Sequence, residues 1–407
     1  MKKLFFLILI ILLNFTNLNA QWEPCNNGID GREIWTFIVD GNNTYVGLDG
    51  GIFKTTDNGD TWLAKRNGLK TPYGYDVYTL AISENRIFAG TAQDGIYLST
   101  DKGENWIHKS NGLPYLHDGW DYSVWIKAIL INGNNIIAGA IESLFLSSDN
   151  GDNWTDQNKE FKDSIREIRS FIKNGNYIFA GTHNGIFQST DYGVSWIAKN
   201  NGLDNLDISS LAISGNNIFA GSRYRIFLST DNGDYWKNIG LKDSIVILTI
   251  IFKSNYIIIG GWGGIYLSSD NGNIWLQKNL GLSSHCISAL IINGDYIFAA
   301  SCGSGIFRAK LSDLGITDVK ETELKIENVI YPNPAASDFK LKYNASNSKT
   351  QISIFDMLGN LVFISYDDSN PGVNEKTIDC SRFSTGYYVV KVQCGEAVQT
   401  HPLMILK

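Results

Sequence analysis

The sequence predicts an all-β chain with a large repetitive domain and a small second domain. Two observations carry most of this prediction. An eight-residue pattern, Ser/Thr-x-Asp-x-Gly-x-x-Trp, occurs six times, and short apolar segments with strand-like alternation recur between its copies. The chain of 407 residues also contains 11 Trp, 40 Gly and only 7 Pro, which suits strands joined by tight turns.

Residues 1–20 have the features of a secretory signal peptide. Lys2 and Lys3 precede the apolar run LFFLILIILL, and the small residue Ala20 stands at the expected cleavage site. The run is shorter than the ~20 apolar residues of a membrane-spanning helix. We therefore expect export with cleavage after Ala20, and no transmembrane segment in the mature chain.

Charge and cysteine spacing restrict the partners. The formal net charge of −7 argues against nucleic acid or an anionic membrane surface as a partner. None of the 5 cysteines forms a CxxC pair, and the acidic residues of the repeat lack the closing Glu of a calcium loop. We expect no metal site and no cofactor.

The repeated pattern suits a tight β-turn. Asp accepts hydrogen bonds from nearby backbone N–H groups, Gly tolerates positive φ, and Trp is large enough to fix the returning strand. We interpret the Asp and Trp of every copy as structural residues: Asp57, Trp62, Asp101, Trp106, Asp149, Trp154, Asp191, Trp196, Asp231, Trp236, Asp270 and Trp275.

The copies follow one another at intervals of 39 to 48 residues. This period is typical of a β-propeller, in which each repeat forms one four-stranded blade. The pattern resembles the Asp-box (BNR) repeat of sialidase-like and related propellers. A strand-opening triplet, as in Gly185-Ile186-Phe187, counts seven blades over residues 21–311. The seventh triplet has no repeat turn after it, but Trp22–Ile29 matches Trp196–Leu203. We therefore expect the first strand of the mature chain to close the seventh blade and to remove an open sheet edge.

A polar linker is expected at 312–328, followed by a small antiparallel β-sandwich at 329–407. Strand-like runs occur there at 339–343, 351–355, 361–365, 376–378 and 387–393. Three motifs, beginning at Tyr331, Ile352 and Ser384, resemble the type A C-terminal sorting domain of the Bacteroidetes type IX secretion system. The resemblance implies engagement with that machinery, passage through the periplasm, and release or attachment at the outer cell surface.

The candidate binding surface lies on the face opposite the repeat turns. The second-to-third-strand loops and the blade-joining loops meet there, and two long insertions, at 70–77 and 114–125, come from adjacent blades. Aromatic rings beside carboxylates are suited to gripping sugars, although the same rings also suit a minor core. The candidate ligand-binding residues are Tyr73, Tyr75, Asp94, Tyr115, Asp118, Trp120, Asp121, Tyr122, His183, Arg223, Arg225 and Trp262.

The predicted function is non-catalytic binding of a glycan or a protein outside the cell. One alternative is a glycoside hydrolase acting on an extracellular polysaccharide, with a carboxylate pair such as Asp94 and Asp118 as acid and base. Another is a scaffold for protein assembly. Sialidases resemble the chain through the boxes but have six blades and an arginine cluster. Xyloglucanase-type enzymes pair two propellers, whereas one is expected here. No catalytic residue is assigned.

The cysteines suggest a disulfide bond at the closing blade. Cys25, Cys286 and Cys302 all fall on that blade, so we expect either a Cys286–Cys302 or a Cys25–Cys302 disulfide. A second pair, Cys380 with Cys394, is a further hypothesis for the tail.

Overall fold

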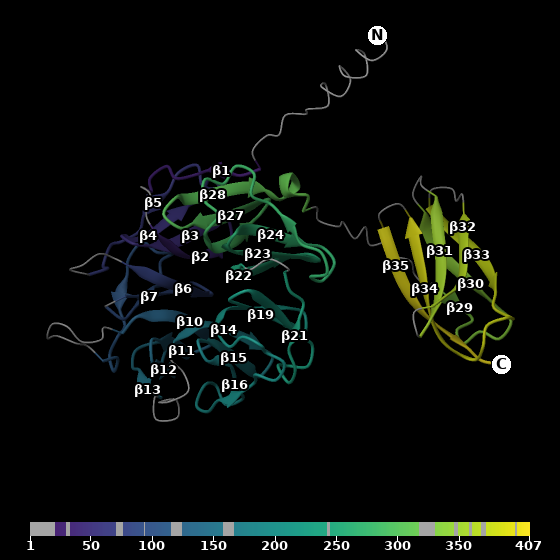
Figure 1. Ribbon diagram of the computed structural model, residues 1–407, viewed down its shortest axis with the longest axis horizontal. Helices are drawn as coiled ribbons and strands as arrows, with labels where there is room; N and C mark the ends of the chain where they lie inside the picture. Colours follow the sequence, from purple (N-terminus) through teal and green to yellow (C-terminus); the bar gives the residue numbers. More distant parts are fainter. Residues whose placement is uncertain are drawn as a thin grey trace, which may run out of the picture. The chain divides into compact units, whose positions relative to one another are not determined.

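The computed structural model describes residues 21–29, 33–70, 76–92, 94–114, 124–157, 167–241, 245–316, 330–345, 349–357, 360–367, 372–394 and 397–407. The expected signal peptide lies outside these residues, as does most of the expected linker. The chain forms two compact units, residues 1–317 and residues 318–407 (Figure 1). Strands make up nearly all of the regular structure in the described residues, as the sequence predicted.

Seven four-stranded antiparallel sheets form the described part of the first unit. The first strands are β2 (Ile34–Asp40), β6 (Val77–Ser83), β10 (Ile126–Asn132), β14 (Ile168–Asn174), β18 (Ile208–Ser214), β22 (Val246–Lys253) and β26 (Ile287–Asn293). The second strands are β3 (Asn43–Leu48), β7 (Arg86–Thr91), β11 (Asn135–Ala140), β15 (Tyr177–Thr182), β19 (Asn217–Ser222), β23 (Tyr256–Trp262) and β27 (Tyr296–Ser301). The third strands are β4 (Gly51–Thr55), β8 (Ile96–Ser99), β12 (Ser143–Ser147), β16 (Gly185–Ser189), β20 (Arg225–Ser229), β24 (Gly264–Ser268) and β28 (Gly305–Lys310). The fourth strands are β5 (Leu63–Ala64), β9 (Ile107–His108), β13 (Thr155–Asp156), β17 (Ile197–Ala198), β21 (Lys237–Asn238), β25 (Leu276–Gln277) and β1 (Glu23–Pro24).

The sheets stand in a closed ring. Each first strand contacts the first strand of the next sheet, and β26 contacts β2. In Figure 1 the first strands surround the centre, whereas fourth strands such as β5 and β13 lie at the outside. Apolar side chains fill the space between neighbouring sheets; Phe88, Ile136 and Phe145, for example, join the second and third sheets. This arrangement is a β-propeller.

The N-terminal strand closes the ring, as the sequence predicted. β1 pairs with β28, so that Pro24 lies opposite Phe307. The Cys25 N–H donates to the Ile306 carbonyl oxygen at 2.9 Å, and Arg308 forms an ion pair with Glu23 at 2.7 Å. The seventh sheet thus combines the front of the described chain with residues almost 300 positions later.

The six repeat turns share one hydrogen-bond pattern. In the turn of Ser229–Trp236, the Ser229 hydroxyl donates to the Asp231 carboxylate at 2.8 Å and accepts the Gly233 N–H at 2.8 Å. The carboxylate also accepts the Tyr235 N–H at 3.0 Å. In the turn of Asp57, slight burial alone would raise the carboxyl pKa, but hydrogen bonds from Thr55 and Thr61 lower it to about 2.

The tryptophan of the repeat turn joins neighbouring sheets. The Trp236 indole N–H donates to the Lys199 carbonyl oxygen of the preceding sheet at 2.9 Å. Gly202 allows this approach, because a Cβ atom there would lie 2.2 Å from the Trp236 carbonyl oxygen. The equivalent indoles that donate to the preceding sheet are those of Trp62, Trp106 and Trp154. At the seventh sheet Trp22 takes this place, since its indole donates to the Lys278 carbonyl oxygen at 2.8 Å.

Two repeat tryptophans differ from this arrangement. The indoles of Trp196 and Trp275 donate to glycine carbonyls of their own turns, Gly193 and Gly272, each at 3.0 Å. Both rings are partly exposed, whereas Trp236 is fully buried. Among the six repeat turns, the segments before Trp196 and Trp275 lack the Asn-Gly pair that precedes the other four tryptophans. The pair is not required in every case, because Trp22 bonds to the preceding sheet beside Asn279-Leu280-Gly281.

Only one of the two candidate disulfides of the ring is present. Cys286 bonds to Cys302, with Cα atoms 5.4 Å apart, whereas Cys25 is free and buried. The Cys380–Cys394 hypothesis is wrong, because Cys380 is a free thiol in the apolar core of the second unit.

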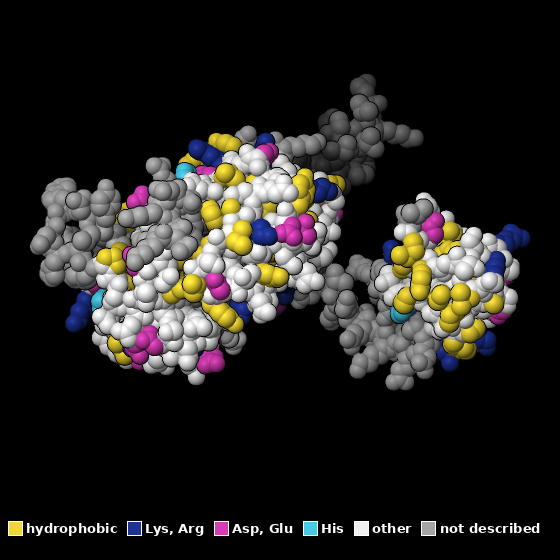
Figure 2. Space-filling model, turned by 90° about the horizontal axis from the view of Figure 1, so that it is seen from below, with side chains coloured by type: hydrophobic (Ala, Val, Ile, Leu, Met, Phe, Trp, Pro, Cys, Tyr) yellow, Lys and Arg dark blue, Asp and Glu magenta, His cyan; other side chains and the backbone are white. Residues whose placement is uncertain are grey.

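The second unit is a sandwich of two antiparallel sheets. One contains β29 (Ile330–Tyr331), β30 (Asp338–Ala345) and β33 (Gly372–Asp379), and the other contains β32 (Leu361–Asp367), β31 (Thr350–Asp356), β34 (Gly386–Cys394) and β35 (Ala397–Ile405). The five strand-like runs of the sequence all fall within these strands. Figure 2 shows hydrophobic side chains gathered on the face of this unit that is in view. Its exposed apolar residues include Val362, Ile364, Tyr366, Val373 and Tyr387.

Candidate functional site

Every first strand of the propeller carries a β-bulge at the same place. The register of pairing shifts across the second residue of each first strand, or the third in β22, which leaves one residue per sheet outside the ladder. These bulge residues lie on the innermost strands, at the end where each strand leaves the blade-joining loop. We call them the bulge ring: Trp35, Tyr78, Lys127, Arg169, Ser209, Leu248 and Ser288.

The bulge ring lies on the face opposite the repeat turns, because antiparallel strands alternate in direction. The first-to-second and third-to-fourth connections share one face, and the remaining connections share the other. The large members of the ring are consecutive, from the first sheet to the fourth. The small hydroxyls take a structural role: Ser209 and Ser288 donate to backbone carbonyls of the next sheets, those of Ile247 and Ile34.

Three aromatic rings and a lysine form a continuous cluster within this sector. The ring centroids of Trp35 and Tyr78 lie 4.5 Å apart, and Tyr78 stacks on Trp125 at 5.6 Å with an interplanar angle of 22°. Lys127 Nζ lies 3.5 Å from the centroid of the Tyr78 ring and 5.0 Å from that of Trp125. All four side chains are only partly buried. We call them the aromatic-lysine cluster; it can stack on an apolar ring face and present a positive charge beside it.

Carboxylates border the cluster on the side of the first sheet. Burial, followed by the charges of Asp49 and Glu33, raises the pKa of Asp76 above its ordinary value. Burial also raises the pKa of Tyr78, with contributions from Asp76 and Glu33. These carboxylates are acceptors for hydroxyl or amide donors of a ligand.

An ionic network borders the cluster on the side of the fourth sheet. Arg169 Nε donates to Glu167 at 2.8 Å, and Arg169 Nη1 donates to Asp207 at 2.5 Å. His183 Nδ1 lies 3.0 Å from the same Asp207 oxygen. His183, one of the sequence-predicted candidates, thus lies beside the bulge residue Arg169 through their shared partner Asp207. Arg169 is fully engaged by two carboxylates, which favours a positioning role.

The other described candidates lie apart from the cluster. Asp94 accepts a hydrogen bond from the Tyr97 hydroxyl, and its backbone oxygen contacts His108, so its carboxylate is turned into its own sheet. On the fifth sheet, Arg225 pairs with Asp204 at 3.3 Å and Arg223 lies over the Tyr224 ring at 5.5 Å. On the sixth sheet, Trp262 is 56% exposed next to the disulfide, since it bridges to Cys286.

Seven candidates lie outside the described residues: Tyr73, Tyr75, Tyr115, Asp118, Trp120, Asp121 and Tyr122. The described ends of these insertions reach the aromatic-lysine cluster: Asp76 lies beside Tyr78, and Trp125 is itself a member of the cluster. The sequence predicted that the two insertions lie in one sector, but Trp35, Tyr78 and Lys127 were not among its candidate residues. Aligning the repeats would have indicated these three residues, since each of them follows the first apolar residue of its strand.

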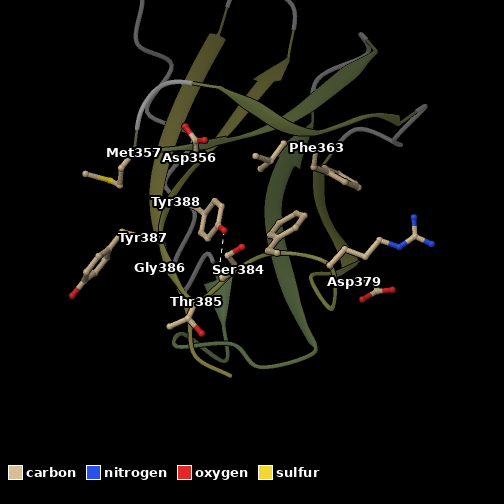
Figure 3. A pocket seen from close by; sticks show the side chains of 12 residues that line it. Asp356, Met357, Phe363, Asp379, Ser384, Thr385, Gly386, Tyr387 and Tyr388 are labelled. Carbon is tan, nitrogen blue, oxygen red and sulfur yellow. Dashed lines mark hydrogen bonds between the residues drawn. The ribbon is translucent and has the colours of Figure 1, made fainter.

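The C-terminal unit has a pocket of about 880 Å³ (Figure 3). Parts of two sequence motifs line it: Asp356 and Met357 at the end of β31, and Ser384–Tyr388 at the start of β34. The Tyr388 hydroxyl donates to the Ser384 carbonyl oxygen at 2.9 Å, as the dashed line in Figure 3 shows. The chain end lies beside this pocket, because the Lys407 N–H donates to Thr385 Oγ1 at 3.2 Å.

Sequence comparison identifies the C-terminal unit. Residues 329–406 match the model of the secretion system C-terminal sorting domain. The chain is therefore exported through the type IX secretion system to the cell surface or the medium, as predicted. No helix among the described residues has the length and apolarity needed to cross a membrane. No curated protein matches the chain in sequence.

Solved structures share the fold at low identity. PorZ, a bacterial surface component of the type IX secretion system of Porphyromonas gingivalis, has a TM-score of 0.56 at 14% identity over 94% of this chain and 60% of PorZ. YCF48 bound to D1 peptide has a TM-score of 0.55 at 16% identity over 71% of this chain and 97% of YCF48. The extracellular domain of BT4673 from Bacteroides thetaiotaomicron has a TM-score of 0.58 at 14% identity over 81% and 46%. The chain thus spans less than two thirds of PorZ and less than half of BT4673.

Proposed function

We propose that this exported propeller is a non-catalytic binding protein that grips a glycan at the aromatic-lysine cluster. The observation that carries the proposal is the gathering of Trp35, Tyr78 and Trp125 on one side of the bulge ring, with carboxylates beside them. Aromatic rings stack on the apolar faces of sugars, and carboxylates accept sugar hydroxyls. The hydrogen bonds of the repeat turns also support their resemblance to Asp boxes.

The structure does not favour the carboxylate pair named for the hydrolytic alternative. Asp94, one of the two carboxylates it would use, is engaged by the Tyr97 hydroxyl. The likeness to YCF48 bound to D1 peptide makes a peptide the natural competing ligand. A likeness at 16% identity shows the fold alone, so the proposal depends on the side chains.

The test is a glycan array probed with the full chain and with two variants, Tyr78→Ala and Trp125→Ala. Trp262→Ala is the matched control, because Trp262 is an exposed aromatic residue on the same face but on the sixth sheet. Removing an aromatic anchor at the centre of a binding site costs at least ~2 kcal/mol, or roughly 30-fold in Kd. We expect that loss in both cluster variants and less than about threefold change in the control.

Three results would overturn the proposal. Binding that depends on Trp262 and not on the cluster would place the site elsewhere. An empty array together with tight binding of a peptide would replace the ligand class. Release of reducing sugar from a bound glycan would show that the chain is an enzyme.

A further inference from the structure

The aromatic-lysine cluster holds a cation in an unusual setting for this propeller. Lys127 extends from the bulge of β10 and lies over the Tyr78 ring, within 5.0 Å of the Trp125 centroid as well. Burial lowers its pKa; the charge of Glu167 opposes that effect, and the charge of Arg169 adds to it. A charged amine that has lost water is stable only where an anion or aromatic faces replace that water.

Lys127 has no carboxylate partner within the part of the chain that the structure describes. Lysines at the outside of the same propeller do have one: Lys65 pairs with Glu104 at 2.6 Å, and Lys199 pairs with Asp234 at 2.5 Å. The neighbouring cation, Arg169, already engages Glu167 and Asp207. The ammonium of Lys127 is therefore the described cation of this sector that remains available to a ligand.

The sector is electrically polarised along the ring. Glu33, Asp49 and Asp76 lie at the end formed by the first and second sheets, and Lys127 lies on the third. The aromatic rings occupy the space between these charges. A ligand that fits must offer hydrogen-bond donors at one end, an apolar ring face in the middle and a negative charge at the other end.

We propose that the glycan bound at the aromatic-lysine cluster is an acidic one, and that its anionic group pairs with Lys127 while its hydroxyls donate to the carboxylates of the first and second sheets. This inference rests on the proposed function. A polyanion without free hydroxyls fits less well, because the carboxylate end would repel it. The charge on the sugar can be a carboxylate or a sulfate, since a lysine ammonium binds either as a point charge.

The experiment compares paired oligosaccharides on the full chain. The probes are oligogalacturonate and hyaluronan oligosaccharides, their carboxyl-reduced neutral counterparts, and sulfated dextran oligosaccharides. We expect the acidic member of a pair to bind at least tenfold more tightly than its neutral counterpart, with a difference that shrinks as salt is added. In Lys127→Met the two members should bind equally weakly, whereas Lys127→Arg should keep the preference.

Lys199→Met is the matched control, because it removes one positive charge from the turn at the outside of the ring. It should leave the preference unchanged. If Lys127→Met does not fold, Lys127→Gln provides the same comparison with a polar side chain. Far-UV circular dichroism and the urea midpoint identify the folded variants.

The outcomes distinguish a failure of the acidic-glycan inference from a failure of the proposed glycan binding. Preference for sulfated probes that disappears in Lys127→Met supports the inference and identifies the anion. Equal binding of acidic and neutral members by the wild-type chain overturns the inference and leaves glycan binding intact. Unchanged preference in Lys127→Met overturns the role of Lys127. Binding of an acidic peptide with no glycan bound overturns both.

Discussion

The two kinds of repeat tryptophan provide the sharpest test of how the ring is held together. Trp236 is fully buried, and its indole donates to the preceding sheet at 2.9 Å. Trp196 occupies the same position in the previous repeat, but its ring is partly exposed and its indole donates within its own turn. The two sites have the same residue and the same turn, so they differ mainly in whether the indole is buried and bonded to the preceding sheet. Replacing each by Ala measures that difference.

The expected magnitudes follow from burial. A fully buried aromatic residue removes ~150–250 Å² from water, which at about 25 cal/mol per Å² gives ~4–6 kcal/mol. Truncation of buried Trp or Phe to Ala costs ~3–5 kcal/mol in practice. We expect Trp236→Ala to lower the free energy of unfolding by ~4 kcal/mol and Trp196→Ala to lower it by ~2 kcal/mol, because part of the latter ring already faces water.

The assay is urea unfolding of the full chain, followed by tryptophan fluorescence and by near-UV circular dichroism. The midpoint shift, multiplied by the wild-type slope, gives each change in free energy. Trp236→Phe tests the hydrogen bond between the sheets alone, because it keeps an apolar ring and leaves the Lys199 carbonyl without its indole donor. We expect it to lower the free energy of unfolding by ~1–3 kcal/mol. Equal losses in the two alanine variants, or a larger loss at Trp196, would refute the division into joining and non-joining tryptophans.

Two further predictions concern the turns. In Gly68→Ala the new Cβ would lie 2.1 Å from the Trp106 carbonyl oxygen at a φ of +92°, whereas in Gly41→Ala it meets nothing within 4 Å at a φ of +57°. Gly41→Ala should therefore cost only the ~1–2 kcal/mol of a left-handed residue, and Gly68→Ala distinctly more, measured as urea midpoints; similar losses would contradict the steric argument. The folded-state pKa of Asp57 is about 2, below its ordinary ~3.9, so the stabilisation it gives is present above about pH 4 and is lost as the pH falls toward about 2. The midpoints of the wild type and Asp57→Asn should converge over that interval, and a gap that persists at about pH 2 would show that the carboxylate charge is not the cause.

The sequence predicted the fold well because its signals are local and repeated. The turn pattern, the strand-opening triplet and the match between Trp22–Ile29 and Trp196–Leu203 each follow from a few neighbouring residues. The closure by β1 could be inferred because the same segment occurs as the end of another repeat. The choice of Cys286 as the partner of Cys302 could not be inferred, since it depends on which of two strand ends lies within 5.4 Å.

The described ends of the two insertions lie close to the aromatic-lysine cluster, but the sequence did not indicate most of its members. Trp125 belongs to the second insertion, but the other three members, Trp35, Tyr78 and Lys127, lie in first strands, where the sequence showed only ordinary strand positions. A β-bulge turns one residue out of the ladder without a Gly or Pro to mark it. Trp35, Tyr78 and Lys127 share no residue type, so only their common position in the register identifies them.

The bulge ring also bears on the proposed function, because its side chains differ from sheet to sheet while the bulge does not. All seven sheets carry the bulge, so the bulge alone does not distinguish one sector from another. On the fifth and seventh sheets the bulge residue is a serine whose hydroxyl bonds to the next sheet, and such a side chain is too short to reach a ligand. On the first three sheets the same position carries a large aromatic residue or lysine. Because the backbone is fixed by ladder hydrogen bonds on either side of each bulge, these side chains are held on a rigid scaffold. The geometry thus separates the bulge residues that bond to a neighbouring sheet from those whose side chains form the aromatic-lysine cluster.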